Sequence, residues 1–478
     1  MANKKIYITT AIDYVNSSPH VGHAVEKIQA DVLARHYRQK EDHEVFFLSG
    51  VDENSLKNVL AAKKVGMDTA AFVEKNSKEF SGLKEMLNLS YDDFIYTTSK
   101  KHFDGCKKLW QALKPEDLYK KNYKGYYCVG CEEFKTEAEL VDGKCVEHSN
   151  AVPEIVSEEN YFFKLSNYQD QLLKLIETDE LKIVPEFRKN EVVSFIKSGL
   201  EDFSVSRSKE RAQNWGVPVP GDEAQIMYVW VDALANYITG LGYADEGDLY
   251  KKFWEAGEDI THIIGKGILR FHAIYWPALL LSAGVPLPKT IYAHEYLTIN
   301  GKKMSKSIGN VIFPQEIVDK YGVDGARYLL LTGLPYNNDG DITWEKMDLK
   351  YTSDLSNGIG NLTHRVISMI NRYEMDAHIL ETPVVATAEF VEGFKFAEGL
   401  EQIVESVGET NRLIDNEKPW EKVKKGDTVG AGATLNVAYN SLLQIAIALV
   451  PFMPETAQKM KKQLETLTPE PMFPRVEK

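Results

Sequence analysis

Strand-like and helix-like segments alternate along much of the chain, and this alternation constrains the fold more than any other feature. Residues 5–10 are apolar and β-branched, and after a turn-rich loop apolar residues recur at helical spacing from Val21 to Leu33. A second strand-like run at 45–48 precedes a helical pattern at 54–64. Strands that alternate with helices form parallel sheets, so we predict an α/β fold with a doubly wound parallel sheet of the Rossmann type.

The same alternation returns at 226–237, 260–281 and 291–299, after a long stretch that is rich in turns and contains three of the four cysteines. We therefore expect an insert that splits the sheet. Beyond residue 349 strand signals disappear and apolar residues keep a helical spacing. The predicted domains are residues 1–113 and 220–348 as the two halves of the sheet domain, 114–219 as the connective insert, and 349–478 as an all-α helical bundle.

The balance of charge excludes one class of protein. The chain has 478 residues, with 56 Lys and Arg against 70 Asp and Glu, and a formal net charge of -14. A histone-like protein that binds nucleic acid through charge alone would be basic. The chain starts without a signal-peptide core, and no stretch reaches the roughly 18 apolar residues of a spanning helix. We expect a cytoplasmic protein without membrane contact.

Two histidines open the first predicted helix, in the segment between Ser18 and His23. Ser18 suits an N-cap and Pro19 the first helical position, which would place His20 and His23 in the first turn on one face. A helix N-terminus favours anions, and Gly22 lets a ribose or a ring approach the backbone. The segment indicates a nucleotide site, although two surface histidines can equally well open a helix.

A lysine-rich loop, Gly-Lys-Lys-Met-Ser-Lys-Ser from Gly301 to Ser307, follows a predicted strand. Lys303 and Lys306, with Ser305 between them, can hold a polyphosphate and neutralise charge on a leaving pyrophosphate. Taken alone, such a loop is usually solvated surface. The chain has no Gly-x4-Gly-Lys-Ser/Thr segment, which excludes a P-loop enzyme.

The cysteines of the predicted insert have metal-ligand spacing. Cys128-Val-Gly-Cys131 is followed by Cys145-Val-Glu-His148, which supplies four ligands on two turns. This pattern is typical of a closed tetrahedral Zn²⁺ site, here a structural knuckle that holds an insert with little core of its own. We interpret Cys106, which lies outside the pattern, as a buried apolar residue.

The histidine segment and the lysine-rich loop together resemble the HIGH and KMSKS signatures of class I aminoacyl-tRNA synthetases, in the same order and on the same kinds of element. Within that class the chain most resembles the methionyl-tRNA synthetases, over nearly its whole length. The segments that carry the resemblance are 9–23, 47–54, 125–148, 203–207, 228–237, 264–277, 303–307, 361–365 and 418–420.

The resemblance implies a methionine site and an ATP site. Asp52 would hold the α-ammonium group, and the side chain would lie among Ala11, Ile12, Tyr14, Trp230, Ala233, Tyr237, Ile268 and His272. An apolar, aromatic slot suits a thioether, although each of these residues alone is as well explained by the core. ATP, accompanied by Mg²⁺, would lie on His20, Gly22, His23, Gly265, Lys303, Ser305 and Lys306. The catalytic residues among them would be His20, His23, Lys303 and Lys306.

The implied activity is that of a methionine–tRNA ligase, which forms methionyl-adenylate and pyrophosphate from L-methionine and ATP. Methionine then passes to the 3′-terminal adenosine of tRNA(Met), including initiator tRNA. The helical domain would read the anticodon through Asn361, Arg365 and Trp420, and we expect a monomer. Two alternatives stay open: another class I ligase such as cysteinyl, and a non-catalytic synthetase-like tRNA-binding protein. Asn54 and Gly267 motivate the second alternative, because many family members have His and Asp there.

Overall fold

A computed structural model describes residues 3–128, 133–135, 140–145, 152–304, 309–380 and 384–475. Contacts within the chain divide it into two units. Unit 1 consists of Met1–Pro19, Glu41–Leu83 and Tyr91–His294, and unit 2 consists of His20–Lys40, Lys84–Ser90 and Glu295–Lys478. The predicted insert falls entirely within unit 1, and the predicted helical domain falls entirely within unit 2. The four-part division itself stays a prediction.

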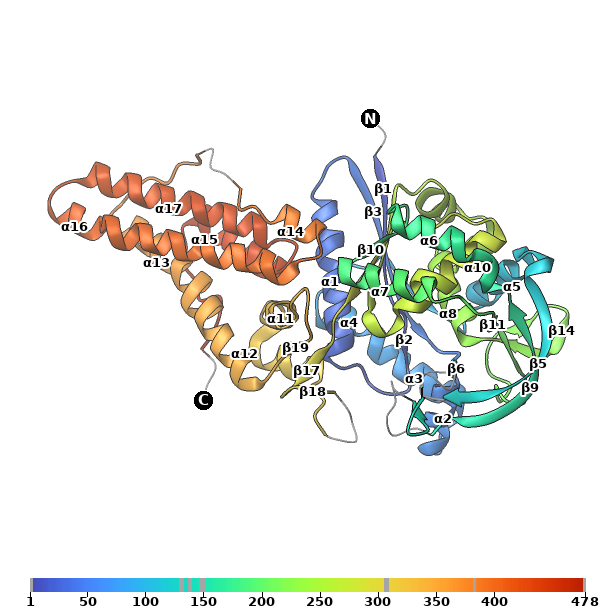
Figure 1. Ribbon diagram of the computed structural model, residues 1–478. Helices are drawn as coiled ribbons and strands as arrows, with labels where there is room; N and C mark the ends of the chain where they lie inside the picture. The colour runs from blue at the N-terminus through green and yellow to red at the C-terminus, as the bar shows by residue number, and fades with distance from the viewer. Residues whose placement is uncertain are drawn as a thin grey trace. The chain divides into compact units, whose positions relative to one another are not determined.

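Unit 1 is built on a parallel sheet of seven strands in the order β10-β16-β15-β1-β3-β2, with β4 paired to β3 (Figure 1). The strands are β1 (Lys4–Thr10), β2 (Asp13–Tyr14), β3 (His43–Asp52), β4 (Asp93–Tyr96), β10 (Lys182–Val184), β15 (Asp259–Gly265) and β16 (Thr290–His294). β1 lies inside the sheet, where Ile6 is opposite both Val45 and Asp259. Because such strands are covered on both faces, they are continuous apolar runs, and the predicted parallel α/β fold is confirmed.

The helices of unit 1 follow the strands in sequence; most share one large apolar core, but the first two place Ala62, Phe72, Val73 and Phe80 in a separate, smaller cluster. They are α2 (Leu56–Lys64), α3 (Thr69–Ser81), α5 (Lys100–Ala112), α6 (Gln169–Glu177), α7 (Glu186–Lys197), α8 (Val229–Thr239), α9 (Asp248–Tyr250) and α10 (Trp276–Ala283). Tyr7, Leu48, Trp254 and Trp276 are among the buried residues of this core. A short helix, α4 (Leu83–Met86), lies where the chain passes from unit 1 to unit 2.

The insert forms its own antiparallel sheet but also returns a strand to the parallel one. Its sheet has the order β11-β9-β5-β6, from β5 (Leu118–Cys128), β6 (Glu133–Lys135), β9 (Glu154–Phe163) and β11 (Phe203–Ser204). A hairpin of β7 (Leu140–Val141) and β8 (Lys144–Cys145) lies apart from it. β10 belongs to the predicted insert by sequence, yet it pairs in parallel with β16.

One predicted strand belongs to a different sheet. The run at 226–231 was expected to join the parallel sheet, but β14 (Asp222–Met227) ends early and pairs antiparallel with β12 (Ser206–Ser208) and β13 (Pro218–Val219). Helix α8 begins two residues after β14 and takes up the rest of the run, including Trp230. The prediction for this segment is wrong because an apolar run does not reveal which sheet it joins.

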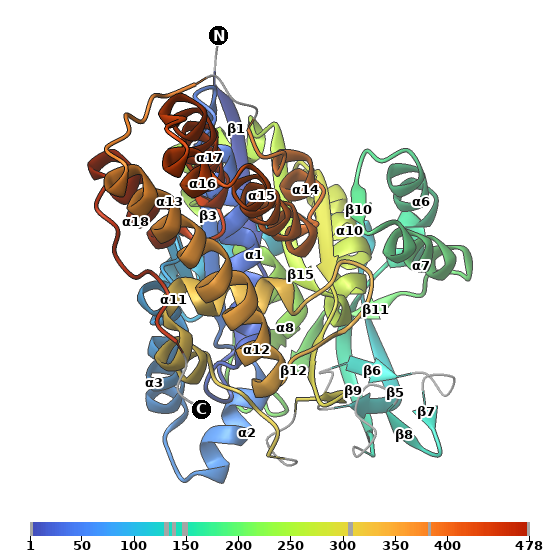
Figure 2. The same ribbon diagram turned by 90° about the vertical axis from the view of Figure 1, so that its left-hand side faces the viewer.

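Unit 2 is mostly helical (Figure 2). Its helices are α1 (Val21–Arg38), α11 (Pro314–Thr332), α12 (Trp344–Lys350), α13 (Asn361–Arg372), α14 (Ala388–Glu392), α15 (Phe396–Glu417), α16 (Pro419–Lys424), α17 (Thr428–Leu449) and α18 (Pro454–Thr466), with a π-helical stretch at Tyr351–Gly360. A small sheet joins β17 (Leu297–Ile299), β18 (Lys302–Lys303) and β19 (Gly340–Asp341). Within 349–380 and 384–475 every regular element is helical, which confirms the predicted helical region.

Contrary to the expectation from the sequence, helix α17 is long and apolar enough to cross a membrane by length and composition alone. In the structure 56% of its apolar window is buried, and the helix packs against α15 and α18. A helix with this burial and these neighbours is a core helix of unit 2.

Candidate active site

Three predicted methionine-site residues are linked by hydrogen bonds in unit 1. The Tyr237 hydroxyl lies 2.6 Å from Nε2 of His272, and Nδ1 of His272 lies 2.9 Å from the carbonyl oxygen of Ile268. A carbonyl oxygen can only accept, so Nδ1 carries a proton and Nε2 is left for the tyrosine hydroxyl. The arrangement fixes the plane of the imidazole ring beside α8.

Trp230 and Ala233 lie on the same helix as Tyr237, at positions that share one face of α8. The Trp230 ring stacks on Phe271 with centroids 3.7 Å apart and meets His272 edge to face at 6.3 Å. All three α8 residues are buried. The structure therefore brings the predicted aromatic wall together, and it adds Phe271, which the sequence did not indicate.

The remaining predicted methionine-site residues lie at or just beyond the carboxyl ends of β1 and β3. Ala11 and Ile12 come directly after β1, and the short pairing of β2 with β3 places Tyr14 opposite Asp52. The ammonium group of Lys57 lies 3.9 Å from the centre of the Tyr14 ring. Open α/β sheets bind ligands at this edge. Asp52, the last residue of β3, is buried there.

His262 is a buried residue of this region that the sequence did not indicate. Its ring stacks on Tyr237 with centroids 4.0 Å apart, and its Nδ1 lies 2.7 Å from the hydroxyl of Thr9. Burial, and then the nearby His272, lowers the pKa of His262 well below its ordinary value, so the ring is neutral. In the sequence, a histidine inside the apolar run that forms β15 could have pointed to this residue.

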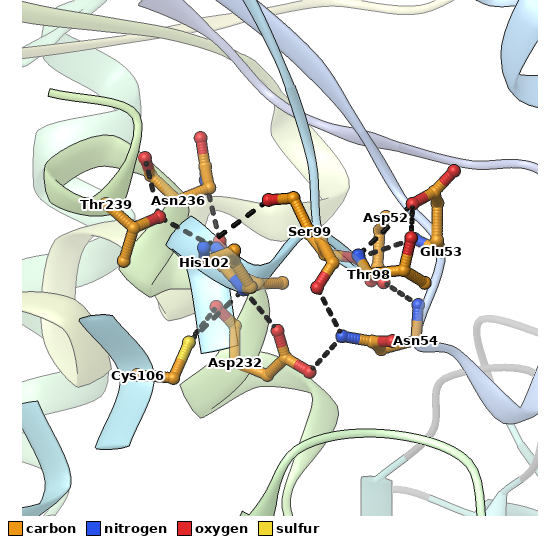
Figure 3. A network of polar contacts seen from close by, with 12 residues as sticks. Asp52, Glu53, Asn54, Thr98, Ser99, His102, Cys106, Asp232, Asn236 and Thr239 are labelled. Carbon is orange, nitrogen blue, oxygen red and sulfur yellow. Dashed lines mark hydrogen bonds and ion pairs between the residues drawn. The ribbon is translucent and has the colours of Figure 1, made fainter. Parts of the chain in front are cut away.

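A polar network buried between α5 and α8 was also not predicted (Figure 3). Nε2 of His102 lies 2.6 Å from one oxygen of Asp232, and the other oxygen accepts from the Asn54 side chain at 2.8 Å. The sulfur of Cys106 lies 3.2 Å from the same Nε2. Burial, and then the charge of Asp232, raises the pKa of the Cys106 thiol. Cys106 is buried as predicted, but in polar rather than purely apolar surroundings.

The three donor atoms of this network lie within 4.8 Å of one another, a spacing that metal ligands can have. Here, however, Nε2 of His102 and the Asp232 oxygen contact each other directly at 2.6 Å. We therefore interpret the group as a hydrogen-bonded network rather than as a metal centre.

In unit 2 the two signature histidines cap their own helix. His20 is the N-cap of α1; its Nδ1 accepts from the Gly22 amide at 3.1 Å, and Nδ1 of His23 accepts from the His20 amide at 3.1 Å. The two rings are stacked, with centroids 3.8 Å apart. The prediction of Ser18 as the N-cap is wrong, because the imidazoles supply the acceptors that a serine would otherwise provide.

Met304 of the lysine-rich loop and Ile312, which follows the loop in sequence, lie beside this capped turn. The Val21 amide donates to the carbonyl of Ile312 at 3.2 Å. A side chain at Gly22 would come within 2.9 Å of the His20 ring and 3.2 Å of the Met304 methyl group, so a larger residue there would displace the capping ring. Thus both signatures meet within unit 2.

Lys303 ends β18 and is exposed, with its ammonium group 5.2 Å from the Tyr296 ring centre. The turn before it is formed by Asn300 and Gly301, which both have positive φ, as a two-residue hairpin requires. Ser305 and Lys306 lie outside the described residues. Gly265 belongs to unit 1, where it ends β15.

Two of the four predicted zinc ligands are described. Cys128 ends β5 and Cys145 ends β8, and both are buried, without a disulfide among the described cysteines. Buried sulfurs at the ends of two strands fit the donor set of a structural zinc knuckle. Cys131 and His148 lie outside the described residues.

The predicted anticodon residues are partly brought together. The guanidinium of Arg365 on α13 lies 5.6 Å from the ring centre of Trp420 on α16 and bonds to Asp415 at 2.6 Å. Asn361, the first residue of α13, is exposed one turn before Arg365. Trp420 is only half-buried, so part of its ring faces solvent.

Comparison with known proteins agrees with these features. A family model described as tRNA synthetases class I (M) matches residues 6–151 and 135–367. The parallel sheet, the paired histidines and the adjoining lysine-rich loop define a class I aminoacyl-tRNA synthetase. A methionine–tRNA ligase of Brucella suis biovar 1 is 41% identical over 96% of this chain and 92% of its own length. This chain belongs to the methionyl-tRNA synthetase family.

Other relatives lead to the same family. A methionine–tRNA ligase of Rhizobium meliloti is 42% identical over 95% of this chain and 90% of its own. A structure of Mycobacterium tuberculosis methionyl-tRNA synthetase in complex with methionyl-adenylate has a TM-score of 0.89 and 37% identity, covering 99% of this chain and 98% of that one. The apo form from the same organism has a TM-score of 0.83 and 34% identity, covering 100% and 99%.

Proposed function

We propose that this chain is an active methionine–tRNA ligase. It activates L-methionine with ATP to methionyl-adenylate and pyrophosphate, then transfers methionine to the 3′-terminal adenosine of tRNA(Met), including initiator tRNA. The observation that carries the proposal is the hydrogen-bonded set of Tyr237, His272 and Ile268, a built aromatic wall in a chain that keeps both class I signatures.

In this proposal the methionine side chain lies against Trp230, Ala233 and Tyr237, with Ala11, Ile12, Tyr14, Ile268 and His272 completing the site. Rings favour a thioether, because sulfur is polarisable and gains from contacts with aromatic groups. Asp52 binds the α-ammonium group as a buried carboxylate. Such a site rejects shorter aliphatic amino acids only modestly, since one methylene contributes about 1 to 3 kcal/mol.

The nucleotide is assigned to His20, Gly22 and His23 of the capped turn and to Lys303, Ser305 and Lys306 of the lysine-rich loop. The family resemblance adds Gly265, at the end of β15, to the predicted ATP-binding residues. The methionine carboxylate attacks the α-phosphorus in line, and pyrophosphate leaves. The reaction needs positioning and positive charge rather than a protein nucleophile. His20, His23, Lys303 and Lys306 supply these, and Mg²⁺ accompanies ATP as part of the substrate.

We assign a structural Zn²⁺ to Cys128, Cys131, Cys145 and His148. When bound, it holds the turns of the insert together and takes no part in the reaction. Equimolar zinc in the purified protein that is lost in Cys128→Ser but kept in Cys106→Ser would support the assignment. Zinc content that Cys128→Ser leaves unchanged would refute it.

The tRNA is assigned to the helical region, where Arg365 and Trp420 already contact each other and Asn361 is exposed nearby. Unpaired loop bases are recognised by stacking on aromatic rings and by hydrogen bonds to their edges. We also propose that the protein acts in the cytoplasm as a monomer. A mass in solution twice that of the chain would contradict the monomer.

The test is amino-acid-dependent exchange of pyrophosphate into ATP. We expect exchange with methionine and not with cysteine or isoleucine. Exchange that depends on cysteine instead would favour the cysteinyl alternative. Absence of exchange with every amino acid, from protein that still binds tRNA, would favour a non-catalytic tRNA-binding protein.

A further inference from the structure

Helix α8 carries the aromatic wall of the proposed methionine site, and one histidine of α5 holds it at two places. Nε2 of His102 contacts Asp232 in the first turn of α8 at 2.6 Å, and Nδ1 contacts the hydroxyl of Thr239, the last residue of α8, at 2.7 Å. These two positions are seven residues apart and share one face of the helix. A single imidazole ring therefore fixes both the rotation of α8 about its axis and its position along that axis relative to α5.

The two helices approach closely where this ring lies. A side chain at Gly105 would come within 2.4 Å of the Thr239 methyl group, so α5 needs glycine there. His102, Asp232 and Thr239 are each at most 1% exposed. Without competing water, hydrogen bonds at such positions are strong and costly to break.

Asp232 also connects α8 to the segment that contains Asp52. Its second carboxylate oxygen accepts from the Asn54 side-chain amide at 2.8 Å. The backbone N–H of Asn54 donates to the Asp52 carboxylate at 3.1 Å. The Asn54 side chain additionally donates to the carbonyl of Thr97 at 3.0 Å. Figure 3 shows this path from His102 through Asp232 and Asn54 to Asp52.

We propose that His102, Asp232 and Asn54 are positioning residues that set the length of the amino acid accepted by the site. This inference rests on the proposed function, in which Asp52 holds the α-ammonium group and α8 holds the side chain. The path joins Asp52 to α8 through buried hydrogen bonds, so it fixes the distance between the ammonium site and the side-chain site. A site of fixed length excludes a side chain with one additional methylene, because interiors are close-packed and accommodate extra atoms poorly.

The test compares kcat/KM for pyrophosphate exchange with L-methionine and with L-ethionine, whose side chain is one methylene longer. The ratio of the two values measures discrimination, independently of how much protein is active. We expect Asp232→Ala to lower the ratio about tenfold, the lower end of what one methylene contributes. Asp232→Asn should keep it within about threefold, since its amide can accept from Asn54 and donate to His102.

Three further variants make the outcomes distinguishable. Asn54→Ala breaks the same path from its other side, so it should lower the ratio even if Asp232→Ala does not fold. Cys106→Ala alters the same buried cluster without breaking the path, so its ratio should equal that of the unmodified protein. Asp52→Asn should weaken the use of both amino acids equally, which tests the proposed ammonium site separately.

An unchanged ratio in Asp232→Ala or Asn54→Ala, with both amino acids slowed alike, would overturn the inference while leaving the proposed function intact. An equal fall in Cys106→Ala would also overturn it, because general loosening of the core would then be the cause. If the unmodified protein exchanges with neither amino acid, the proposed function itself fails.

Discussion

Arg327 and Asp31 form an ion pair that is closed to water: a guanidinium nitrogen lies 2.8 Å from a carboxylate oxygen, and neither side chain has exposed surface. Asp31 lies on α1, the helix capped by His20, and Arg327 lies on α11. The same guanidinium donates to the carbonyls of Leu87, Pro451 and Phe452. The pair thus ties the helix of the first signature to segments from three other parts of unit 2.

Breaking this pair should destabilise the protein strongly. Arg327→Met leaves the Asp31 carboxylate buried without its main partner, and we expect the free energy of unfolding at pH 7 to fall by about 3 to 5 kcal/mol. Urea denaturation measures this change. Arg38→Ala, which removes an exposed arginine of the same helix, is the control and should cost less than about 1 kcal/mol. Equal losses in the two variants would refute the role of the pair.

The pair also predicts the direction of acid destabilisation. Burial alone would raise the pKa of Asp31, but Arg327 and Arg35 outweigh it, and the pKa is lowered. A lowered pKa in the folded state adds stability that is complete above the unfolded value, near about 4, and is lost as pH falls through the folded value. Unfolding titrations below about pH 4 should show a loss that is absent in Asp31→Asn.

The Tyr237 hydroxyl should matter for methionine binding. Tyr237→Phe removes the donor to His272, and losing such a buried partner costs about 1 to 3 kcal/mol. We expect a KM for methionine raised about tenfold with little change in kcat, since the group acts in the ground state and the transition state alike. Tyr250→Phe, in the same core, is the control. A fall in kcat with KM unchanged would contradict this role.

The positive charge of Lys303 in the lysine-rich loop should act mainly in the transition state, when negative charge develops on the leaving pyrophosphate. Lys303→Ala is expected to lower kcat for methionine-dependent exchange about a hundredfold, the size of one lost oxyanion contact, with smaller effects on the KM for methionine. Lys302 is the matched control, because successive residues of β18 point to opposite faces. Comparable losses in Lys302→Ala would indicate that the overall positive charge of the loop matters, rather than a specific contact between Lys303 and the phosphates.

Trp420 should affect tRNA and not amino acid activation. One stacked base contributes about 1 to 3 kcal/mol, so Trp420→Ala should lower kcat/KM for tRNA charging roughly 5- to 150-fold. Trp420→Phe keeps an aromatic ring and should retain most of the activity. Methionine-dependent exchange should be unchanged in both variants. If exchange falls together with charging, the assignment of Trp420 to the anticodon is wrong.

Much of the fold was predictable, since periodicity is a local property of the sequence. Strand β1 and helix α1 appear almost where the pattern placed them, because apolar spacing directly reflects which face is buried. β10 was missed, because three residues are too few to show a period. His20 was not expected to cap its own helix, since histidine is not among the usual N-cap residues.

The candidate site was predictable where its residues match the segments that carry the family resemblance, and not where partners come from distant segments. Trp230, Tyr237 and His272 were indicated by family resemblance, and the structure joins them. His102 and Asp232 are 130 residues apart in sequence, and nothing local in either segment indicates the other. Long-range polar pairs of this kind become visible only when the fold is known.

The most direct test of methionine activation is a single-turnover reaction of the intact protein with α-phosphate-labelled ATP and methionine, followed by addition of tRNA(Met). We predict that labelled methionyl-adenylate forms only with methionine and then disappears as AMP and methionyl-tRNA appear. Protein that binds tRNA(Met) but forms no adenylate would contradict the account and favour a non-catalytic relative of the synthetases.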